Sequence, residues 1–153
     1  MWYNLITDDL SNIPDAMSFF EAELDSAKNE TKIIGSLEKN SQELSGITSY
    51  RYIQLQELEA ILKYLNIQYD KLRSGHYRKY LERYQRDLTD RSIEKYIDGE
   101  NDIVDMNILI NQISLMRNKY LGLMKGLDVK QYQIGHIVKL RTAGLESITL
   151  NNA

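Results

Sequence analysis

The chain has 153 residues, with 19 Lys or Arg, 22 Asp or Glu and two His, so its formal net charge is −3 at pH 7. This length predicts one domain with a sizeable core. The absence of cysteine excludes disulfides and thiolate metal sites. No apolar run reaches the roughly 18 residues of a membrane span, and the first residues lack the order of a signal peptide. We therefore expect a cytoplasmic protein with no membrane contact, in the host cytoplasm if it is viral.

The charge is unevenly distributed along the chain. Residues 1–62 carry 4 basic and 11 acidic side chains, residues 63–91 carry 8 and 4, and residues 92–153 carry 7 and 7. The acidic total therefore hides a local basic segment. A patch of this kind attracts an anionic partner.

The N-terminal part is predicted to begin with an irregular arm over residues 1–13. Trp2 and Tyr3 are large, so we expect the arm to dock on this subunit or on a neighbouring one. Pro14 suits the first turn of a helix, where its missing N–H costs nothing. Apolar residues then recur at helical spacing: Met17, Phe20, Leu24, Ala27, Thr31 and Ile34. A break is expected at Ser45-Gly46.

The regular series that follows alternates by three and four, as in a heptad pattern: Leu55, Leu58, Leu62, Leu65, Tyr69 and Leu72. Residues 15–73 are thus predicted to form long helices. Ser74-Gly75 is expected to end them, because glycine tolerates the left-handed conformation at a helix end.

Residues 76–99 are predicted to form a basic and aromatic helical segment that ends at Gly99. At 100° per residue its apolar side chains share one face: Tyr77, Tyr80, Leu81, Tyr84 and Leu88. Lys79, Arg83 and Arg86 fall on the opposite face.

Residues 100–144 are predicted to form C-terminal assembly helices, with a loose tail over 145–153. A third series begins there: Ile103, Met106, Ile110, Ile113, Tyr120, Met124 and Leu127. Arg117 interrupts it, as polar residues that fix register often do. One helix is expected to end near Gly126 and another to run from Lys130 to Ala143.

Strand signals are weak, so the predicted fold class is all-α, a single helical domain with long helices and coiled-coil-like seams. Three such seams in a short chain are more than one subunit easily buries. We therefore expect a homo-oligomer, with partner helices from other copies.

The basic segment is the candidate functional site. Cations with aromatic rings between them suit a flexible nucleic-acid strand, since the cations meet phosphates and the rings stack on bases. The candidate nucleic-acid-binding residues are Lys63, Lys71, Arg73, Tyr77, Arg78, Lys79, Tyr80, Arg83 and Arg86. Two alternatives stay open: the tyrosines pack on a core, and the basic side chains only solvate a helix face.

No feature of the sequence indicates catalysis, a cofactor or a metal site. His76 and His136 are single histidines far apart in the sequence. The acidic run from Asp98 to Asp105 lacks the order of a calcium-binding loop, and capping of the next helix is the simpler interpretation. Phosphate-cradling glycine clusters and zinc spacings are also absent. We expect a protein that is not an enzyme.

The C-terminal half resembles the UvsY-like family of phage recombination mediators. The resemblance lies in RSIEKYIDGENDI (91–103), YLGLMKGLD (120–128) and QIGHIVKLRTAG (133–144), with KLRSGHY (71–77) as a fourth matching stretch. Residues 25–144 are covered, and the order of the four stretches is more specific than any one of them. Leu140 departs from the pattern, because the family has an aromatic residue before the arginine.

The resemblance implies a non-enzymatic helper of homologous recombination that binds single-stranded DNA and forms rings of several subunits. Such a protein helps a RecA-like recombinase to displace the single-strand DNA-binding protein. The DNA contacts of the family carry over only to Lys63, Lys71 and Arg73, and the C-terminal helices would carry assembly. The alternative is a coiled-coil structural or scaffolding protein without a nucleic-acid function.

Overall fold

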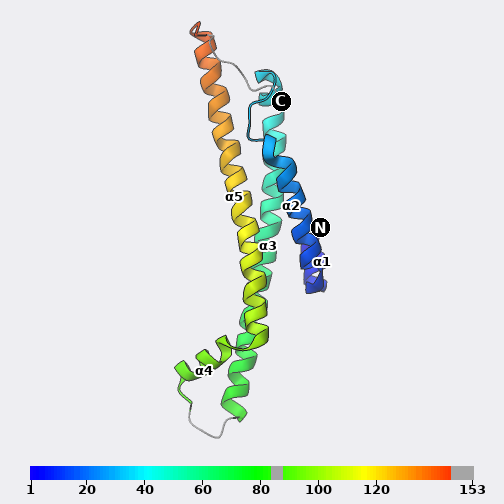
Figure 1. The fold of residues 1–153 in the computed structure, drawn as a ribbon, viewed down its shortest axis with the longest axis vertical. Coiled ribbons are helices and arrows are strands. Elements are labelled where there is room, and N and C mark those ends of the chain that lie inside the picture. The colour runs from blue at the N-terminus through cyan, green and yellow to red at the C-terminus, as the bar shows by residue number, and fades with distance from the viewer. Residues whose placement is uncertain (84–87, 146–153) are drawn as a thin grey trace.

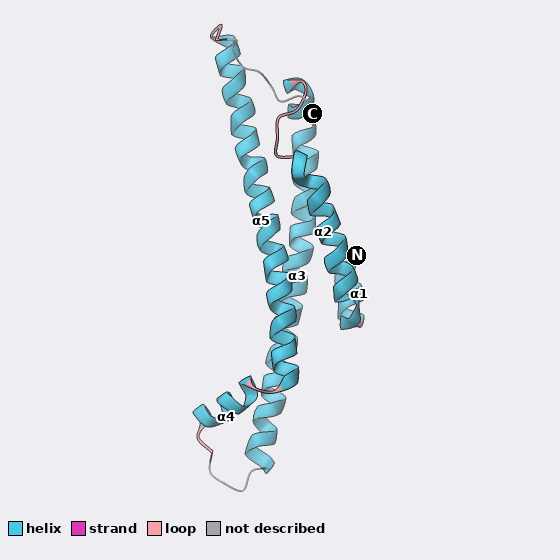
Figure 2. Ribbon diagram, viewed as in Figure 1, coloured by secondary structure: helices cyan, strands magenta, loops and turns pink. Residues whose placement is uncertain are grey.

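A computed structural model of the chain describes residues 1–83 and 88–145. These residues form helices and no strand, so the predicted all-α class is confirmed (Figure 2). Two long helices, α3 (Leu37–Arg83) and α5 (Asn101–Thr142), lie side by side and antiparallel in an elongated pair (Figure 1). At 1.5 Å per residue, the 47 residues of α3 extend over about 70 Å.

The shorter elements pack against this pair. They are α1 (Trp2–Asp8), the 3₁₀ helix η1 (Leu10–Asn12), α2 (Ile13–Ser26), the 3₁₀ helix η2 (Ala27–Asn29) and α4 (Asp90–Asp98). Helices α1 and α2 run along one side of the long pair, and α4 lies at the end where the chain passes from α3 to α5 (Figure 1). As expected, Pro14 lies in the first turn of its helix, α2.

The main core lies where α3, α5 and the N-terminal helices face one another. Its fully or nearly fully buried side chains are Ile6, Ile13, Ala16, Phe20, Leu55, Leu58, Ile61, Leu65, Met106, Ile113, Met116 and Tyr120. The predicted series beginning at Leu55 and at Ile103 both contribute to it. These two series, which we expected to require other copies, therefore bury each other within one chain.

The N-terminal arm is helical, and the prediction of an irregular segment over residues 1–13 is wrong. Ile6 of α1 is fully buried in the main core. The backbone N–H of Tyr3 donates to Glu57 Oε1 at 2.9 Å, and the hydroxyl of Tyr64 donates to the carbonyl of Thr7 at 3.2 Å. The arm thus docks on its own subunit, and burial against α3 stabilises a helix too short to form alone.

The first expected break is misplaced. Helix α2 ends at Ser26, and the chain turns before α3 begins at Leu37, so the series from Met17 to Ile34 does not form one helix. Gly35 has φ +79°, a left-handed conformation that glycine adopts without strain. The turn therefore lies at Gly35, while α3 passes through Ser45-Gly46 without interruption.

Two further expected helix ends are also absent. Helix α3 continues through Ser74-Gly75 to Arg83, so the segment predicted over residues 76–99 is divided between α3 and α4. Helix α5 continues through Gly126 to Thr142 as a single helix. A glycine in a helix costs only about 1 kcal/mol relative to alanine, which the packing of these long helices outweighs. The ends at Gly99 and Gly144 are confirmed, and residues 146–153 of the predicted tail lie outside the described part.

Replacement of Gly75 by alanine tests the continuity of α3. An added Cβ would meet no atom within 4 Å, and the backbone of Gly75 is not left-handed. We expect Gly75→Ala to raise the free energy of unfolding by about 0.5–1 kcal/mol in urea denaturation. The matched control, Gly35→Ala, should lower it by about 1 kcal/mol because Gly35 is left-handed. Destabilisation by Gly75→Ala would indicate a break there.

Candidate nucleic-acid interface

The candidate binding residues lie on the second half of α3, with the exception of Arg86, which is outside the described residues together with Tyr84. The structure divides the remaining eight into three groups. One group is exposed on the side of α3 away from α5, a second is exposed on another side near the end of α3, and the third is held in contacts with α4. Only the first two are available to a ligand.

The first group consists of Lys63, Lys71 and Arg78, which we call the outer cations. Projected at 100° per residue, they fall within an arc of about 80° and extend over about 22 Å of helix. All three are exposed, and none has an ion-pair or hydrogen-bond partner among the described residues. Lys71 and Arg78 line a shallow depression with Ile67 and Asp70. Asp70 and Glu82 project close to this face, so the three outer cations exceed these two acids by only one charge.

Lys79 and Arg83 form the second group. Both are exposed and without an ion-pair partner in the parts of the chain that the structure describes. On the same projection Lys79 lies about 80° and Arg83 about 120° from the nearest outer cation, Lys71. A bound strand would therefore contact both groups only by curving around α3.

Arg73, by contrast, is used within the chain. Its guanidinium donates to Asp98 Oδ1 at 2.6 Å and to the hydroxyl of Tyr69 at 3.1 Å, and it lies 5.6 Å from the centre of the Tyr69 ring. The hydrogen bond to Asp98 raises the pKa of Arg73. Its charge is thus neutralised by a contact between α3 and α4.

Tyr77 and Tyr80 are likewise engaged with the α4 region. The hydroxyl of Tyr77 donates to Asp90 Oδ1 at 2.7 Å, which raises the pKa of Tyr77. The hydroxyl of Tyr80 donates to Glu100 Oε1 at 2.6 Å, and its ring stacks on that of Tyr96 at 5.7 Å. Both rings also pack against a small core of Ile93, Ile97 and Ile103. This geometry matches the alternative interpretation of the sequence, in which the tyrosines pack on a core and do not stack on bases.

His76 completes the contacts at this end of the molecule. Its Nε2 lies 2.8 Å from Asp102 Oδ1, and its Nδ1 lies 4.0 Å from Glu100 Oε1. The hydrogen bond from His76 holds the pKa of Asp102 below its usual value. The acidic run that superficially suggests a calcium loop therefore makes contacts with α3 instead. Within residues 1–83 and 88–145, no three His, Asp or Glu side chains could together hold a metal ion.

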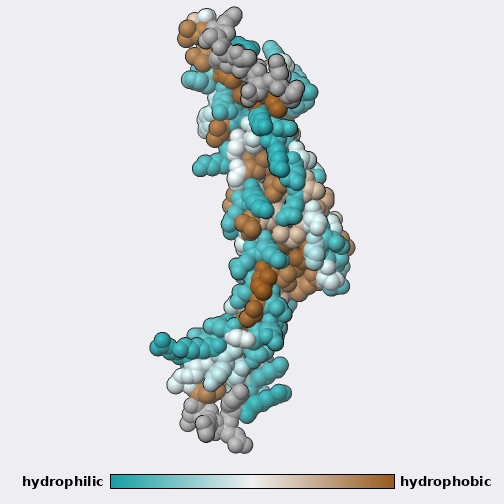
Figure 3. Space-filling view, in the orientation of Figure 1, coloured by the Kyte–Doolittle hydropathy of each residue, from teal (hydrophilic) through white to brown (hydrophobic). Residues whose placement is uncertain are grey.

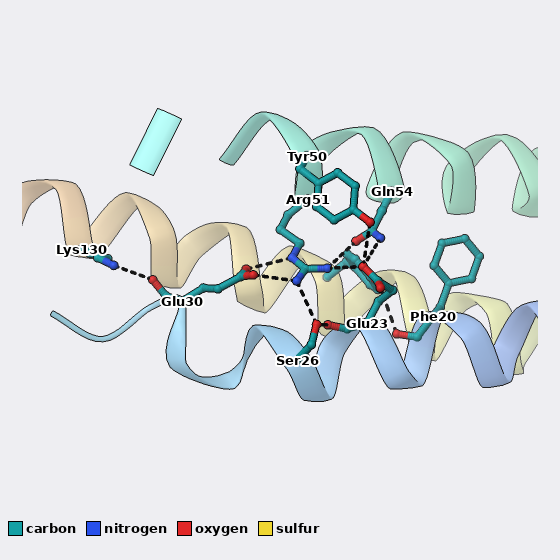
Figure 4. Close-up of polar contacts among 9 residues, drawn as sticks. Phe20, Glu23, Ser26, Glu30, Tyr50, Arg51, Gln54 and Lys130 are labelled. Atoms are coloured by element: carbon teal, nitrogen blue, oxygen red, sulfur yellow. Dashed lines mark hydrogen bonds and ion pairs between the residues drawn. The ribbon is translucent and has the colours of Figure 1, made fainter. Parts of the chain in front are cut away.

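The most elaborate polar cluster was not predicted from the sequence. Arg51 of α3 has a side chain that is only 3% exposed, and it lies between α2 and the turn that follows it (Figure 4). Nε and Nη2 donate to the two carboxylate oxygens of Glu30 at 2.8 and 2.7 Å. Nη1 donates to Glu23 Oε2 at 2.7 Å and to Gln54 Oε1 at 3.0 Å, and Nη2 also donates to Ser26 Oγ at 3.1 Å. These contacts use every N–H donor of the guanidinium.

The neighbours of Arg51 extend the cluster to α5. Gln54 Nε2 donates to Glu23 Oε2 at 2.7 Å, which is the main cause of the lowered pKa of Glu23. Lys130 is 4% exposed and donates through Nζ to the carbonyl of Glu30 at 2.8 Å, while burial lowers its pKa (Figure 4). The cluster therefore fastens α2 and the turn after it to both long helices. Arg51 precedes Leu58 by seven residues, so the heptad spacing could have placed Arg51 on the buried face of α3, but it gave no indication of the partners Glu23 and Glu30.

Arg117, expected to fix register, is half-buried, and its Nε is buried without a hydrogen-bond partner among the described residues.

None of the described helices combines the length and apolar character needed to cross a membrane. Comparison of the chain with protein-family models, with curated proteins and with solved structures finds no match in any of the three.

Proposed function

We propose that this protein binds single-stranded DNA through the side of α3 that carries the outer cations, and that it acts without catalysis as a recombination mediator. In this role several copies assemble, as a ring, and help a RecA-like recombinase to displace the single-strand DNA-binding protein. The recombination role depends on the resemblance of residues 91–103, 120–128 and 133–144 to UvsY-like mediators. The DNA-binding role has support from geometry.

The observation that carries the proposal is the state of Lys63, Lys71 and Arg78. They are exposed on one side of one rigid helix, with no ion-pair partner among the described residues. Cations that are not neutralised within the chain can exchange their counterions for phosphates, which is the main driving force of non-specific binding to nucleic acid. Ile67 is 45% exposed between them and offers an apolar contact to bases.

Assembly would convert this modest site into a tight one. Three cations on one chain bind few phosphates, but linked copies raise the effective concentration of each further site. The tyrosines engaged with α4 are not needed in this account. Their role is to hold α4 against α3, next to the proposed path of the strand.

Charge reversal tests the DNA-binding role. In the triple variant Lys63→Glu, Lys71→Glu and Arg78→Glu, we expect affinity for a fluorescent oligo-dT to fall at least about tenfold at about 0.1 M salt. The slope of log affinity against log salt should become shallower by about 2, since each neutralised phosphate contributes about 0.7 on a single strand. Fluorescence anisotropy over a salt series measures both quantities.

A matched control keeps the same change in net charge. Lys28→Glu, Lys32→Glu and Lys39→Glu reverse three exposed lysines near the junction of α2 and α3, and this variant should keep most of the affinity. Equal losses in the two triple variants would show that only net charge matters, and the proposed site would be wrong.

A scaffolding protein without nucleic-acid function is the second candidate. It is favoured by large apolar side chains that remain exposed on the long helices, among them Ile53 at 59% and Leu115 at 59%. Stable assembly of the wild-type protein with no affinity for oligo-dT at low salt would support this candidate and contradict the first.

A further inference from the structure

Helix α4 carries a line of three exposed acids on the side where it meets α3. Asp90, Glu94 and Asp98 are four residues apart, so they fall within an arc of about 80° and follow one another at about 6 Å along the axis. We call these three residues the acidic stripe. Figure 3 shows a mainly hydrophilic surface over the end of the molecule where α4 lies.

The acidic stripe occupies hydrogen-bond donors of α3. Asp98 accepts from the guanidinium of Arg73 at 2.6 Å, and Asp90 accepts from the hydroxyl of Tyr77 at 2.7 Å. A shallow depression between the two helices is lined by side chains of both: Arg73, Ser74, Tyr77, Arg78, Glu94 and Ile97. The stripe therefore lies where two cations and two hydroxyl groups of α3 border one hollow, and one of these cations is an outer cation.

We propose that this depression is a second phosphate site for single-stranded DNA, and that the acidic stripe competes with the DNA for it. Two guanidinium and two hydroxyl groups around one hollow form a donor set that suits a phosphate. Carboxylates of the stripe take part of this set when no strand is bound. The inference rests on the proposed function, because the strand that reaches Arg78 along the outer cations is the ligand that enters the depression.

The exchange of carboxylate for phosphate requires only side-chain rotation. The side chain of Asp98 is 62% exposed and that of Arg73 is 26% exposed, so water already reaches this ion pair. Exposed pairs contribute little net stability. Helix α4 itself is held by Ile93 and Ile97, which are buried against apolar side chains of α3. A phosphate can thus displace Asp98 while α4 stays in place.

A strand competes with the stripe better than a free anion does. When phosphates are bound at Lys71 and Arg78, the strand presents its next phosphate to Arg73 at a high effective concentration. The carboxylates that are displaced lose their hydrogen bonds, and this loss reduces the gain from binding. The stripe therefore lowers the affinity for DNA, and it favours a strand over small anions that cannot also contact the outer cations.

Neutralisation of the stripe tests this competition. In the triple variant Asp90→Asn, Glu94→Gln and Asp98→Asn, we expect oligo-dT affinity to rise at least about tenfold at about 0.1 M salt. The slope of log affinity against log salt should become steeper by about 0.7, which corresponds to one further phosphate contact. Fluorescence anisotropy over a salt series measures both quantities, and circular dichroism checks that the variant keeps its helices.

Two controls separate release of the donors from a change in overall charge. Glu38→Gln, Glu43→Gln and Asp128→Asn neutralise three exposed acids far from α4, and should raise affinity less than about threefold because salt screens distant charges. In the background Arg73→Gln with Tyr77→Phe, the stripe changes should also raise affinity less than about threefold, since the donors that they release are missing.

The outcomes distinguish this inference from the proposed function. If the wild type binds oligo-dT and neutralisation of the stripe gives no gain, the second site is wrong and the proposed function stands. An undiminished gain in the Arg73→Gln, Tyr77→Phe background would likewise overturn the second site, because only the general field of the acids would then matter. No binding by the wild type or the stripe variant at low salt would contradict both proposals.

A measurement on the wild-type surface does not depend on how the variants fold. In protein labelled with fluorotyrosine, the fluorine NMR signal of Tyr77 is assigned by its loss in Tyr77→Phe. This signal should shift when oligo-dT is added, because the hydroxyl exchanges Asp90 for a phosphate. An unshifted Tyr77 signal at saturating oligo-dT would overturn the inference.

Discussion

Replacement of Arg51 by alanine is expected to lower the free energy of unfolding by about 3 kcal/mol, as measured by urea denaturation. Removing one partner of a buried ion pair costs about 3–5 kcal/mol, because the other charge stays buried without compensation. We expect the lower end of this range, since Glu23 and Glu30 keep 24% and 22% of their side-chain surface exposed. Hydrogen exchange should show the greatest loss of protection in α2 and the turn after it.

A variant without charges around position 51 separates two effects of removing Arg51: the loss of its attraction to the carboxylates, and the cost of leaving those carboxylates without a cation. In Arg51→Met the two carboxylates remain without their cation, whereas Arg51→Met with Glu23→Gln and Glu30→Gln also removes the charge of both carboxylates. The triple variant should therefore be more stable than Arg51→Met alone. The surface pair of Lys28 and Asp25, about 70% exposed on both sides, provides the comparison: Lys28→Ala should cost less than about 1 kcal/mol. A small effect of Arg51→Ala would mean that α2 is held by its apolar face alone.

Replacement of Phe20 by alanine is expected to cost about 3–5 kcal/mol, the range for deletion of a buried aromatic ring. Phe20 is fully buried, and its ring meets that of Tyr120 edge to face at 5.9 Å. The hydroxyl of Tyr120 also donates to the carbonyl of Phe20 at 3.3 Å, so α2 and α5 are joined at this point by both a ring contact and a hydrogen bond. Truncation would leave a cavity where three helices meet.

The adjacent residue is a matched control for this prediction. Phe19 is 38% exposed, and its ring lies 5.8 Å from that of Trp2 near the surface. Phe19→Ala should cost about 1 kcal/mol, because much of the ring is already in water. Thermal or urea unfolding of the two variants compares the sites directly. Equal losses of unfolding free energy in Phe19→Ala and Phe20→Ala would show that α2 does not pack with Phe20 inside and Phe19 near the surface.

Heptad spacing identified the helices of this protein, but it did not identify their ends. The series that includes Leu58 and the series that includes Ile113 were correctly assigned to helices, because burial on one side requires a regular apolar spacing. Glycine was a poor guide to the ends. Gly75 and Gly126 lie inside continuous helices, whereas Gly35 makes the turn. Whether a glycine interrupts a helix depends on how that helix packs over many turns, and the residue type alone does not indicate this.

The sequence predicted where the basic side chains gather, but it did not predict which of them stay exposed. Six of the eight basic residues between positions 63 and 91 lie on α3, and Lys63, Lys71 and Arg78 are exposed there. The sequence did not separate them from Arg73, Tyr77 and Tyr80, because the partners of these residues are supplied by α4 and the start of α5, 13 to 25 residues further along the chain. Cations and rings that are equivalent in composition thus have different functions in the fold.

By itself, the amino-acid sequence determined that the protein is all-α, that its long helices bury regularly spaced apolar residues and that its positive charge gathers between residues 63 and 91. These properties depend on residue type and spacing. The tertiary structure alone decided which apolar series packs against which, which cations have no ion-pair partner within residues 1–83 and 88–145, and where Arg51 finds Glu23 and Glu30. Those outcomes depend on which surfaces meet when the chain folds back on itself, and contacts between residues about 20 to 100 positions apart carry no local signal.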